Sequence, residues 1–522
     1  MIAGTIHLLR LARAGFVFAR EGVLGLVDPQ ALPPPARLAL RLACIVERPS
    51  AGTRSDRLTA ALTRLGPTYV KLGQFLSTRP DVVGALIARD LESLQDKVPP
   101  FDQTLAEQIV ADTLGQPVAE AFASFGPPIA AASIAQVHKA TVRDGDAIRE
   151  VAVKVLRPRV ADRFRADLSD YYFAARLAER LVPDSRRLKP VGIVDTLARS
   201  MAIELDLRLE AAAASEMAER TSDDPGFRVP SVDWNRTGRS VLTTEWIDGI
   251  KLGDREGLAA ANVDPRALGQ IVIQSFLRHA LRDGFFHADM HQGNLFADRA
   301  GNLVAVDFGI MGRIGPKERR FLAEILLGFI TKQYRRVAEV HFEAGYVPSH
   351  HSIDEFAQAI RAIGEPIHSR TADQISMAKL LSLLFEVTAI FDMKTRTELL
   401  LLQKTMVVVE GVARSLDPRL DIWTSSEPVV REWITRNLGP VGRIEEVGSG
   451  VRLVGRVIGE APALLTRAAM LSERIDEMTK DGFVLAPESL KGIGEAEARR
   501  NRSSTVALWV IAALLAAHLI WG

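Results

Sequence analysis

The stretch FHADMHQGNLFA at residues 286–297 places Asp289 and Asn294 five residues apart. Phosphoryl-transfer enzymes use the spacing H-x-D-x-x-x-x-N because the aspartate can orient an attacking oxygen while the asparagine amide oxygen binds Mg²⁺ from the same loop. A lone H-x-D is usually a surface turn, but a DFG tripeptide at 307–309 follows directly behind the apolar run 303–306. Its aspartate, at the end of a predicted strand, would supply a second Mg²⁺ ligand. The two segments together predict metal-dependent phosphoryl transfer.

A lysine on an upstream strand fits the same chemistry. In the run VAVK at 151–154, the period of two places Ala152 and Lys154 on one face. The ammonium could contact phosphates, and the small alanine leaves room for an adenine ring. Lys154 alone could equally be a solvated edge lysine, so it needs a partner. Glu210 is the best candidate, on a predicted helix that carries Glu204 and Asp206 one to two turns earlier, although such an acidic face could also be merely solvated.

An alanine-rich segment precedes this strand. Within PIAAASIAQVH, residues Ala130, Ala131, Ala132 and Ser133 occupy the place where a kinase carries its glycine-rich phosphate loop. Alanine does not favour positive φ as glycine does. We therefore expect a stiffer loop whose backbone N–H groups are less free to wrap a triphosphate. Taken alone, AAAS would be a helix fragment.

The order of elements indicates the fold class. Alternating apolar residues predict an antiparallel hairpin from strands at 137–142 and 151–156. Long helical stretches are predicted between 161 and 220, a strand at 240–246, and mostly helix to about residue 480. Strands followed by a mainly helical half predict an α+β fold with two lobes.

Composition excludes several functions. The 522 residues carry 65 Lys+Arg and 64 Asp+Glu, so the formal charge of +1 provides no global attraction to nucleic acid. The single cysteine, Cys44, excludes internal disulfides and any cysteine-rich zinc or iron–sulfur site.

Both ends of the chain suggest contact with a membrane. The first twenty residues contain Arg10, Arg13 and Arg20 and no acid, which suits a basic interfacial helix or an ordinary helix docked on the domain. The apolar run 506–521 spans about 24 Å as a helix, against about 30 Å of hydrocarbon. We predict a single C-terminal anchor whose upstream arginines stay cytoplasmic, the alternative being a buried or interfacial helix.

These motifs resemble the UbiB-type atypical kinase family, the aarF-domain-containing relatives of protein kinases linked to ubiquinone biosynthesis. The resemblance runs from about residue 57 to residue 421. The motifs that carry it are Lys71-Leu72-Gly73-Gln74, Ala130–Ser133 with Gln136-Val137-His138, Val151–Lys154, Glu204-Leu205-Asp206, His287-Ala288-Asp289 to Asn294, and Asp307-Phe308-Gly309. It implies an α+β, two-lobed protein-kinase-like fold with an N-terminal helical extension and a C-terminal transmembrane helix.

The resemblance also implies roles for residues. Lys71 and Gln74 would belong to a helix that folds over the site where a protein kinase admits a peptide, with Glu204 and Asp206 supporting it. The expected nucleotide-binding set is Lys71, Gln74, Ala130, Ala131, Ala132, Ser133, Ala152, Lys154, Glu204, Asp206 and the hinge residue Glu245, which would bind adenine through its backbone. The expected catalytic set is Lys154 paired with Glu210, and Asp289 as the base-like residue. Asn294 and Asp307 would hold the metal.

By the same resemblance, the expected function is a membrane-associated atypical kinase or ATPase that binds ATP and Mg²⁺ and supports ubiquinone biosynthesis. The expected partners are membrane lipid and prenylated quinone precursors, with quinone-biosynthesis enzymes as further candidates. Nucleic acid is not expected, and a homodimer is left open. The catalytic domain would face the cytoplasm at the cell inner membrane.

The predicted domains follow the motifs. They are a basic helical extension at 1–56, the K-x-G-Q helical region at 57–118, an N-lobe at 119–246, a helical C-lobe at 247–425, a helical region and linker at 426–504, and the anchor at 505–522.

Other functions remain as alternatives. A protein kinase acting on quinone-biosynthesis enzymes would need an activation loop, but the sequence has no Ser, Thr or Tyr between Asp307 and Phe321. An inactive nucleotide-binding scaffold would have no need of two metal ligands. An antibiotic-modifying phosphotransferase shares the H-x-D-x-x-x-x-N loop but not the K-x-G-Q helix. The chain departs from the family at Met290 and Gln292, where prolines are usual, which bears on loop rigidity more than on chemistry.

Overall fold

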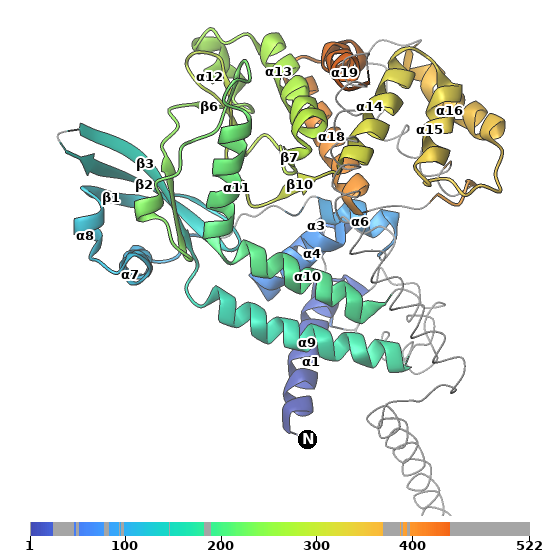
Figure 1. Cartoon of the computed structure of the whole chain (residues 1–522). Coiled ribbons are helices and arrows are strands. Elements are labelled where there is room, and N and C mark those ends of the chain that lie inside the picture. Colours follow the sequence, from blue (N-terminus) through green and yellow to red (C-terminus); the bar gives the residue numbers. More distant parts are fainter. Residues whose placement is uncertain are drawn as a thin grey trace, which may run out of the picture. The chain divides into compact units, whose positions relative to one another are not determined.

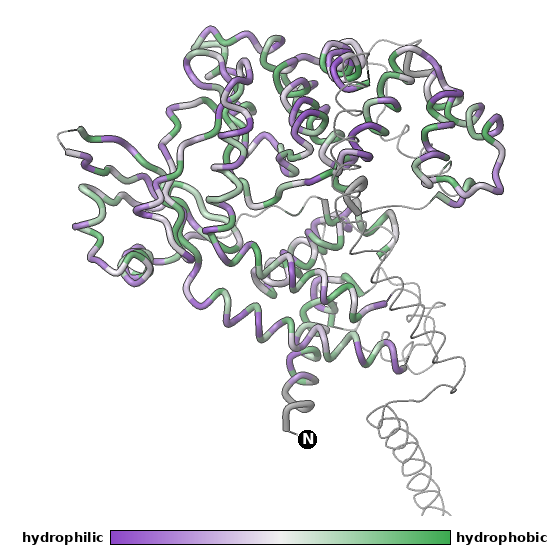
Figure 2. The backbone as a smooth tube through the Cα atoms, in the orientation of Figure 1, coloured by the Kyte–Doolittle hydropathy of each residue, from purple (hydrophilic) through white to green (hydrophobic). Residues whose placement is uncertain are grey.

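The computed structural model describes residues 2–24, 46–47, 52–77, 83–92, 94, 99–145, 147–181, 189–368, 387, 390–393 and 397–438. The chain divides into two units, Met1–Thr435 and Arg436–Gly522, and almost all described residues belong to the first. The predicted anchor at 505–522 lies outside the described residues, as does the chain from 439 onward. Among the helices that are described, none is long and apolar enough to cross a membrane, and Figure 2 shows hydrophilic residues interspersed along them.

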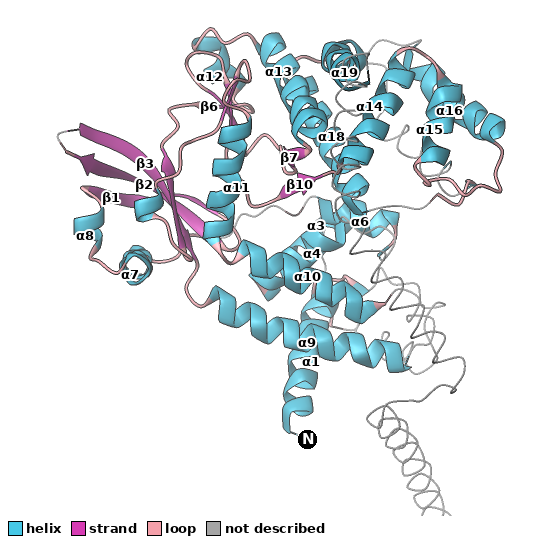
Figure 3. Cartoon of the chain, in the orientation of Figure 1, coloured by secondary structure: helices cyan, strands magenta, loops and turns pink. Residues whose placement is uncertain are grey.

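A four-stranded antiparallel sheet contains the predicted hairpin, which is confirmed (Figure 3). Its strand order is β1-β2-β3-β5, and the strands are β1 Ser124–Ala131, β2 Ala135–Asp144, β3 Ala147–Leu156 and β5 Val241–Glu245. On one face Val151, Val153 and Val155 are fully buried beneath helix α7, Gln103–Leu114. The alternation along β3 therefore leaves Ala152 and Lys154 on the opposite face.

Three helices follow β3, and they correct one prediction. They are α9 Val160–Leu181, α10 Pro190–Glu204 and α11 Leu207–Arg220, of which α9 and α10 lie side by side (Figure 1). The prediction that Glu204, Asp206 and Glu210 share one helix is wrong. Asp206 has an extended backbone, φ −127° and ψ 93°, and its carboxylate accepts a hydrogen bond from the Arg208 N–H as the N-cap of α11. Glu204 and Glu210 therefore lie on different helices and contact different partners.

Helices also precede the sheet. They are α1 Ile2–Arg20, α3 Arg54–Leu65, α4 Pro67–Ser77, α6 Ala85–Glu92, α7 and α8 Val118–Ala121. The chain divides between α3 and α4 at Pro67, because Gly66 adopts φ +110° and ends α3. Gly73 lets α4 pack closely, since a Cβ there would lie 2.5 Å from Leu94 Cδ1 and 2.8 Å from Leu62 Cδ1.

The second half is mainly helical around a large apolar core that includes Phe276, Phe285 and Phe286. Its helices are α12 Arg255–Ala260, α13 Pro265–Arg278, the π-helical turn η5 His279–Asp283, α14 Pro316–Ile330, α15 Tyr334–Glu343, α16 Ile353–His368, α18 Thr397–Leu416 and α19 Ile422–Leu438. Two small sheets carry the loops predicted to be catalytic and metal-binding. Their strands are β4 Phe227–Arg228, β9 Leu303–Ala305, β8 Leu295–Ala297 and β6 Ile250–Lys251 in one, and β7 Phe285–His287 and β10 Met311–Arg313 in the other.

Candidate nucleotide and metal site

Lys154 lies between two carboxylates. Its Nζ is 2.8 Å and 3.0 Å from the two Glu210 oxygens and 3.1 Å from Asp307 Oδ1. The three side chains come from β3, from α11 and from the loop after β9. Lys154 and Glu210 are largely buried, whereas the Asp307 side chain is 46% exposed. One buried lysine is thus shared by two carboxylates, of which one is open to solvent.

The electrostatics differ between these two carboxylates. Burial raises the pKa of Glu210 to about 7, and the attraction of Lys154 offsets this only in part because Asp307 adds a second negative charge. Burial alone would also raise the pKa of Asp307, but the charge and hydrogen bond of Lys154, with help from Lys71, hold it well below its usual range. The same two carboxylates outweigh burial and raise the pKa of Lys154. Asp307 is therefore ionised, while Glu210 titrates near neutral pH.

The loop predicted to be catalytic, from His287 to Asn294, is fixed by its own polar groups. Asn294 Nδ2 lies 3.1 Å from the Asp289 backbone oxygen and 3.4 Å from Asp289 Oδ2. His287 is fully buried, accepts the Asp289 N–H at Nδ1 (3.0 Å) and so donates from Nε2 to the Val306 carbonyl (3.1 Å). Burial lowers the pKa of His287, which keeps the ring neutral. This imidazole joins the loop of Asp289 to the strand end just before Asp307.

The oxygen atoms at this point suit a hard cation. Because Asn294 Nδ2 is turned toward Asp289, the amide oxygen is the atom left for a metal ion. Asp307 has φ +63°, an uncommon backbone for a residue other than glycine, and its Oδ1 also accepts the Gly309 N–H at 3.4 Å. A carboxylate and an amide oxygen are the ligands that Mg²⁺ prefers. The residues present therefore fit Mg²⁺.

Helix α4 brings Lys71 to the site. Lys71 Nζ lies 2.8 Å from Glu204 Oε2, and both side chains are only about one-tenth exposed, at 12% and 11%. Asp206, expected to support the same helix, instead holds the Arg208 guanidinium, with Arg208 Nε 2.9 Å from Oδ1. Lys71 lies close enough to Asp307 to lower the pKa of that carboxyl. Gln74, three residues along α4, is half-buried, and its backbone oxygen accepts the Ser77 hydroxyl.

The alanine-rich segment forms a tight turn between β1 and β2. Ala130 and Ala131 end β1, and the Ala132 N–H donates to the Ala135 carbonyl at 2.8 Å, so the segment is not a helix fragment. Arg157 Nε donates to the Ala132 carbonyl at 3.0 Å, and Ser133 is fully buried. The turn is therefore held from within and by the residue that follows β3.

The hinge residue Glu245 ends β5 opposite Val151, with Ala152 opposite Thr244. The Glu245 N–H donates to the Ser231 carbonyl at 2.8 Å, and the Glu245 carboxylate accepts from Arg228 and Ser231. Its side chain is thus used in holding the strand. If adenine binds here, it would have to contact backbone groups of this strand other than the Glu245 N–H.

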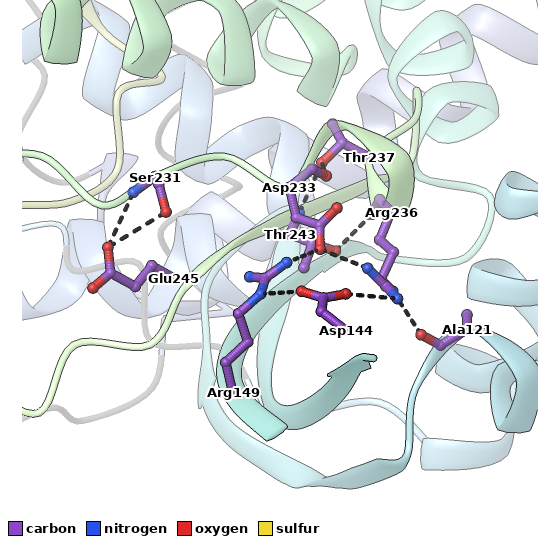
Figure 4. Close-up of polar contacts among 9 residues, drawn as sticks. All are labelled: Ala121, Asp144, Arg149, Ser231, Asp233, Arg236, Thr237, Thr243 and Glu245. Carbon is purple, nitrogen blue, oxygen red and sulfur yellow. Dashed lines mark hydrogen bonds and ion pairs between the residues drawn. The ribbon is translucent and has the colours of Figure 1, made fainter. Parts of the chain in front are cut away.

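A polar network beside this strand was not predicted from the sequence (Figure 4). The buried Asp233 carboxylate accepts from Arg149 of β3 at 2.5 Å and from Arg236 at 2.8 Å, within the short helix η4, Trp234–Arg236. Thr243 of β5 donates to the Arg236 carbonyl at 2.6 Å. These contacts fix the turn before β5 to the sheet, so the network is structural.

Helix α18 braces the catalytic loop through contacts that sequence reasoning also missed. Thr405 Oγ1 donates to the Ala288 carbonyl at 3.1 Å, and Gln292 Nε2 donates to Ser415 Oγ at 2.6 Å. Met290 is fully buried in the core. At the two positions where the family usually has proline, this chain therefore has one residue anchored by packing and one by a hydrogen bond. More than one hundred residues separate Gln292 from Ser415, and no local sequence signal links them.

Comparisons with known proteins agree on one family, the UbiB-type atypical kinases. The family model of the ABC1 atypical kinase-like domain matches residues 93–341, and that of the UbiB helical domain matches residues 360–421. Proteins of Marinobacter nauticus and Xanthomonas euvesicatoria, both described as "Probable protein kinase UbiB", are 40% and 41% identical, over 84% of this chain and 81% of each relative. A Mycobacterium tuberculosis protein solved in complex with erythromycin is 26% identical with a TM-score of 0.52, covering 76% of this chain and 98% of that chain.

Proposed function

The chain belongs to the UbiB family of atypical kinases, and from this premise we propose that it is an ATP- and Mg²⁺-dependent phosphotransferase or ATPase that supports ubiquinone biosynthesis. The observation that carries the proposal is the position of Lys154 between Glu210 and Asp307. The buried Glu210 holds the lysine, and the exposed carboxylate of Asp307 adds a second negative charge next to it that a metal ion would balance.

Each residue of the site has a proposed task. Lys154, held by Glu210, would bind the phosphates of ATP, and Asp307 with Asn294 would hold the metal ion, which when bound would neutralise phosphate charge. Asp289 is 43% exposed and would orient the attacking oxygen of the acceptor. The neutral His287 holds the backbone N–H of Asp289 and so keeps that carboxylate in place.

The chain after the DFG tripeptide leaves little room for a peptide substrate. Strand β10 begins two residues after Gly309 and pairs with β7, and α14 begins at Pro316. A protein kinase would need a longer segment there to position a peptide. The pairing of Lys71 with Glu204 holds α4 close to Asp307. Both features favour a small phenolic lipid or water as the phosphoryl acceptor.

Membrane association is part of the proposal, and α1 supports it. His7 Nδ1 lies 2.5 Å from Asp170 Oδ1 of α9, so the helix is docked on the domain. Leu9 and Phe16 nevertheless remain 67% and 49% exposed. Arg13 is exposed between them at helical spacing, which gives a mixed apolar and basic face of the kind that lies on anionic lipid. Prenylated phenols are apolar and would be found in the lipid on which this face lies.

The test is phosphate release from ATP and Mg²⁺ by the purified full chain, with and without liposomes and a phenolic quinone-precursor analogue. We expect release that depends on Mg²⁺ and rises with both additions. A matched reaction with purified quinone-biosynthesis enzymes and labelled ATP separates lipid from protein as acceptor. Absence of Mg²⁺-dependent ATP binding and of phosphate release would contradict the proposal and favour the scaffold.

A further inference from the structure

A second group of metal-ligand side chains lies on the turn 348–351 that joins α15 to α16, two helices that pack side by side (Figure 1). His350 Nε2 is 3.8 Å and His351 Nε2 is 3.3 Å from the same atom, Oδ2 of Asp392. One ligand atom from each of the three side chains lies within 4.8 Å of the other two. None of them takes part in the phosphoryl-transfer site.

The spacing of these atoms is compatible with metal ligation, although His351 Nε2 at 3.3 Å is also within hydrogen-bonding distance of Asp392 Oδ2. In a tetrahedral zinc site with bonds of about 2.0–2.1 Å, neighbouring ligand atoms lie about 3.3–3.4 Å apart. A good hydrogen bond between nitrogen and oxygen is shorter, about 2.9–3.0 Å. The two observed separations, 3.3 Å and 3.8 Å, lie at and just beyond the tetrahedral edge. Both imidazoles also converge on one carboxylate oxygen, and His350 Nε2, at 3.8 Å, is too far from it for a hydrogen bond.

The backbone presents these side chains from two separately anchored segments. The His351 N–H donates to the Pro348 carbonyl at 3.2 Å, which closes the first turn. Asp392 has φ +48° and follows Phe391, whose buried ring packs on Phe356 with centroids 5.0 Å apart. The His351 ring contacts the same Phe391 at 5.2 Å. The ligands are therefore held in place by the core beneath them.

We propose that His350, His351 and Asp392 bind a first-row divalent metal ion, with Zn²⁺ as the best fit. Two imidazoles and one carboxylate suit zinc, whereas Mg²⁺ requires oxygen ligands. His350 and Asp392 are 67% and 69% exposed, which leaves the fourth position open to water, while His351 is 19% exposed. The bound ion ties the turn 348–351 to the segment 390–393. It is a structural link separate from the nucleotide site.

The test is a titration of the full chain, purified without a polyhistidine tag, with Co²⁺ as a visible probe and Zn²⁺ as competitor. We expect one equivalent of Co²⁺ with the absorption of a tetrahedral ion, displaced by Zn²⁺. His350→Gln, His351→Gln and Asp392→Asn should each weaken binding by about tenfold or more, since removal of a ligand costs at least as much as loss of a residue that orients one. ATP turnover should not change in any of them.

Asp354→Asn is the matched control, because Asp354 is an equally exposed acid on α16 that pairs with Arg335. It should bind Co²⁺ as the unchanged chain does. The His350 side chain is mostly solvent-exposed, so His350→Gln keeps the fold and its result is decisive. A Co²⁺ spectrum that persists unchanged in all three ligand variants, or no binding by the unchanged chain, would overturn the proposal.

Discussion

Two carboxylates, Glu210 and Asp224, are buried beside cations in the same chain, yet their environments are opposite. Glu210 shares its cation, Lys154, with Asp307, and burial raises the pKa of Glu210 to about 7. Asp224 follows α11 and accepts from His279 Nε2 at 3.0 Å and from the Arg282 guanidinium. Burial would raise the pKa of Asp224 as well, but these donors lower it to about 2.

The difference separates a structural cluster from a functional one. Asp224 is 2% exposed and fully supplied with donors, so it joins the segment after α11 to the π-helical turn η5 and has no capacity left for a ligand. The Glu210 cluster has one lysine for two carboxylates, and Asp307 faces solvent. Surplus negative charge at an exposed position is what a site needs in order to recruit a cation and, through it, a phosphate.

The largest effect is expected from Asp307→Asn. Because Asp307 is the only charged metal ligand proposed, ATP turnover should fall by about a hundredfold or more, and Mg²⁺ should no longer raise ATP affinity. The free energy of unfolding should change little, since the substitution also removes a charge that opposes the ionised Glu210. A Mg-ATP titration read by thermal shift, beside a phosphate-release assay, measures both.

Asp248→Asn is the matched control for that variant, because Asp248 is 74% exposed and pairs with the exposed Arg299 on the surface. It should keep full turnover. Unchanged Mg-ATP affinity in Asp307→Asn would refute the assignment of Asp307 as a metal ligand. The Glu210 cluster would then be structural, like the Asp224 cluster.

Asp224→Asn should have the opposite signature. Removing one member of a buried, hydrogen-bonded ion pair should lower the free energy of unfolding by about 3 kcal/mol. Turnover per folded molecule should stay the same. His279 and Arg282 stabilise the ionised form of Asp224. The stabilisation is therefore present above 3.8, the ordinary pKa of an aspartate, and is lost as the pH falls to about 2. Urea unfolding at neutral and acidic pH, with the exposed neighbour Asp223→Asn as control, would show it.

Glu210 predicts a pH dependence of the opposite sign. Its pKa rises from 4.5 to about 7, so protonated Glu210 stabilises the fold below pH 4.5 and this contribution is lost as the pH rises through 7. Turnover should instead increase through pH 7, because only the ionised carboxylate holds Lys154 by charge. Glu210→Gln should remove this limb of the pH–rate profile. A limb that persists in Glu210→Gln would assign the titration to another group.

Several local contacts and elements were predicted from the sequence, and the errors have physical causes. The hairpin and the contact of Lys154 with Glu210 follow from the apolar periodicity and the order of the motifs. The single acidic helix was wrong because the N-cap at Asp206 divides it. The brace between Gln292 and Ser415 depends on tertiary packing across distant segments, which no local pattern encodes. The roles of the site residues and the domain boundaries stay predictions.

The smallest effect is expected from Lys71→Ala, which asks whether α4 belongs to the functional cluster. Lys71 and Gln74 lie three residues apart on α4, and Lys71 pairs with Glu204 at 2.8 Å. Both side chains are only about one-tenth exposed, so leaving Glu204 without this partner should cost about 1–3 kcal/mol of stability. Loss of a positive charge near Asp307 should weaken ATP binding about fivefold, and removal of its bulk should alter turnover or allow autophosphorylation.

Lys71→Arg keeps the positive charge, so its ATP affinity should be close to that of the unchanged chain. Lys317→Ala, at an exposed lysine of α14, should leave ATP affinity, turnover and autophosphorylation unchanged. Nucleotide titration, phosphate release and labelled-ATP autophosphorylation measure them separately. If Lys71→Ala matches the unchanged chain in ATP affinity, ATPase rate and autophosphorylation, Lys71 contributes only its ion pair with Glu204. Helix α4 would then resemble the Asp224 cluster, a closed structural contact, and the closed-site model would be refuted for this chain.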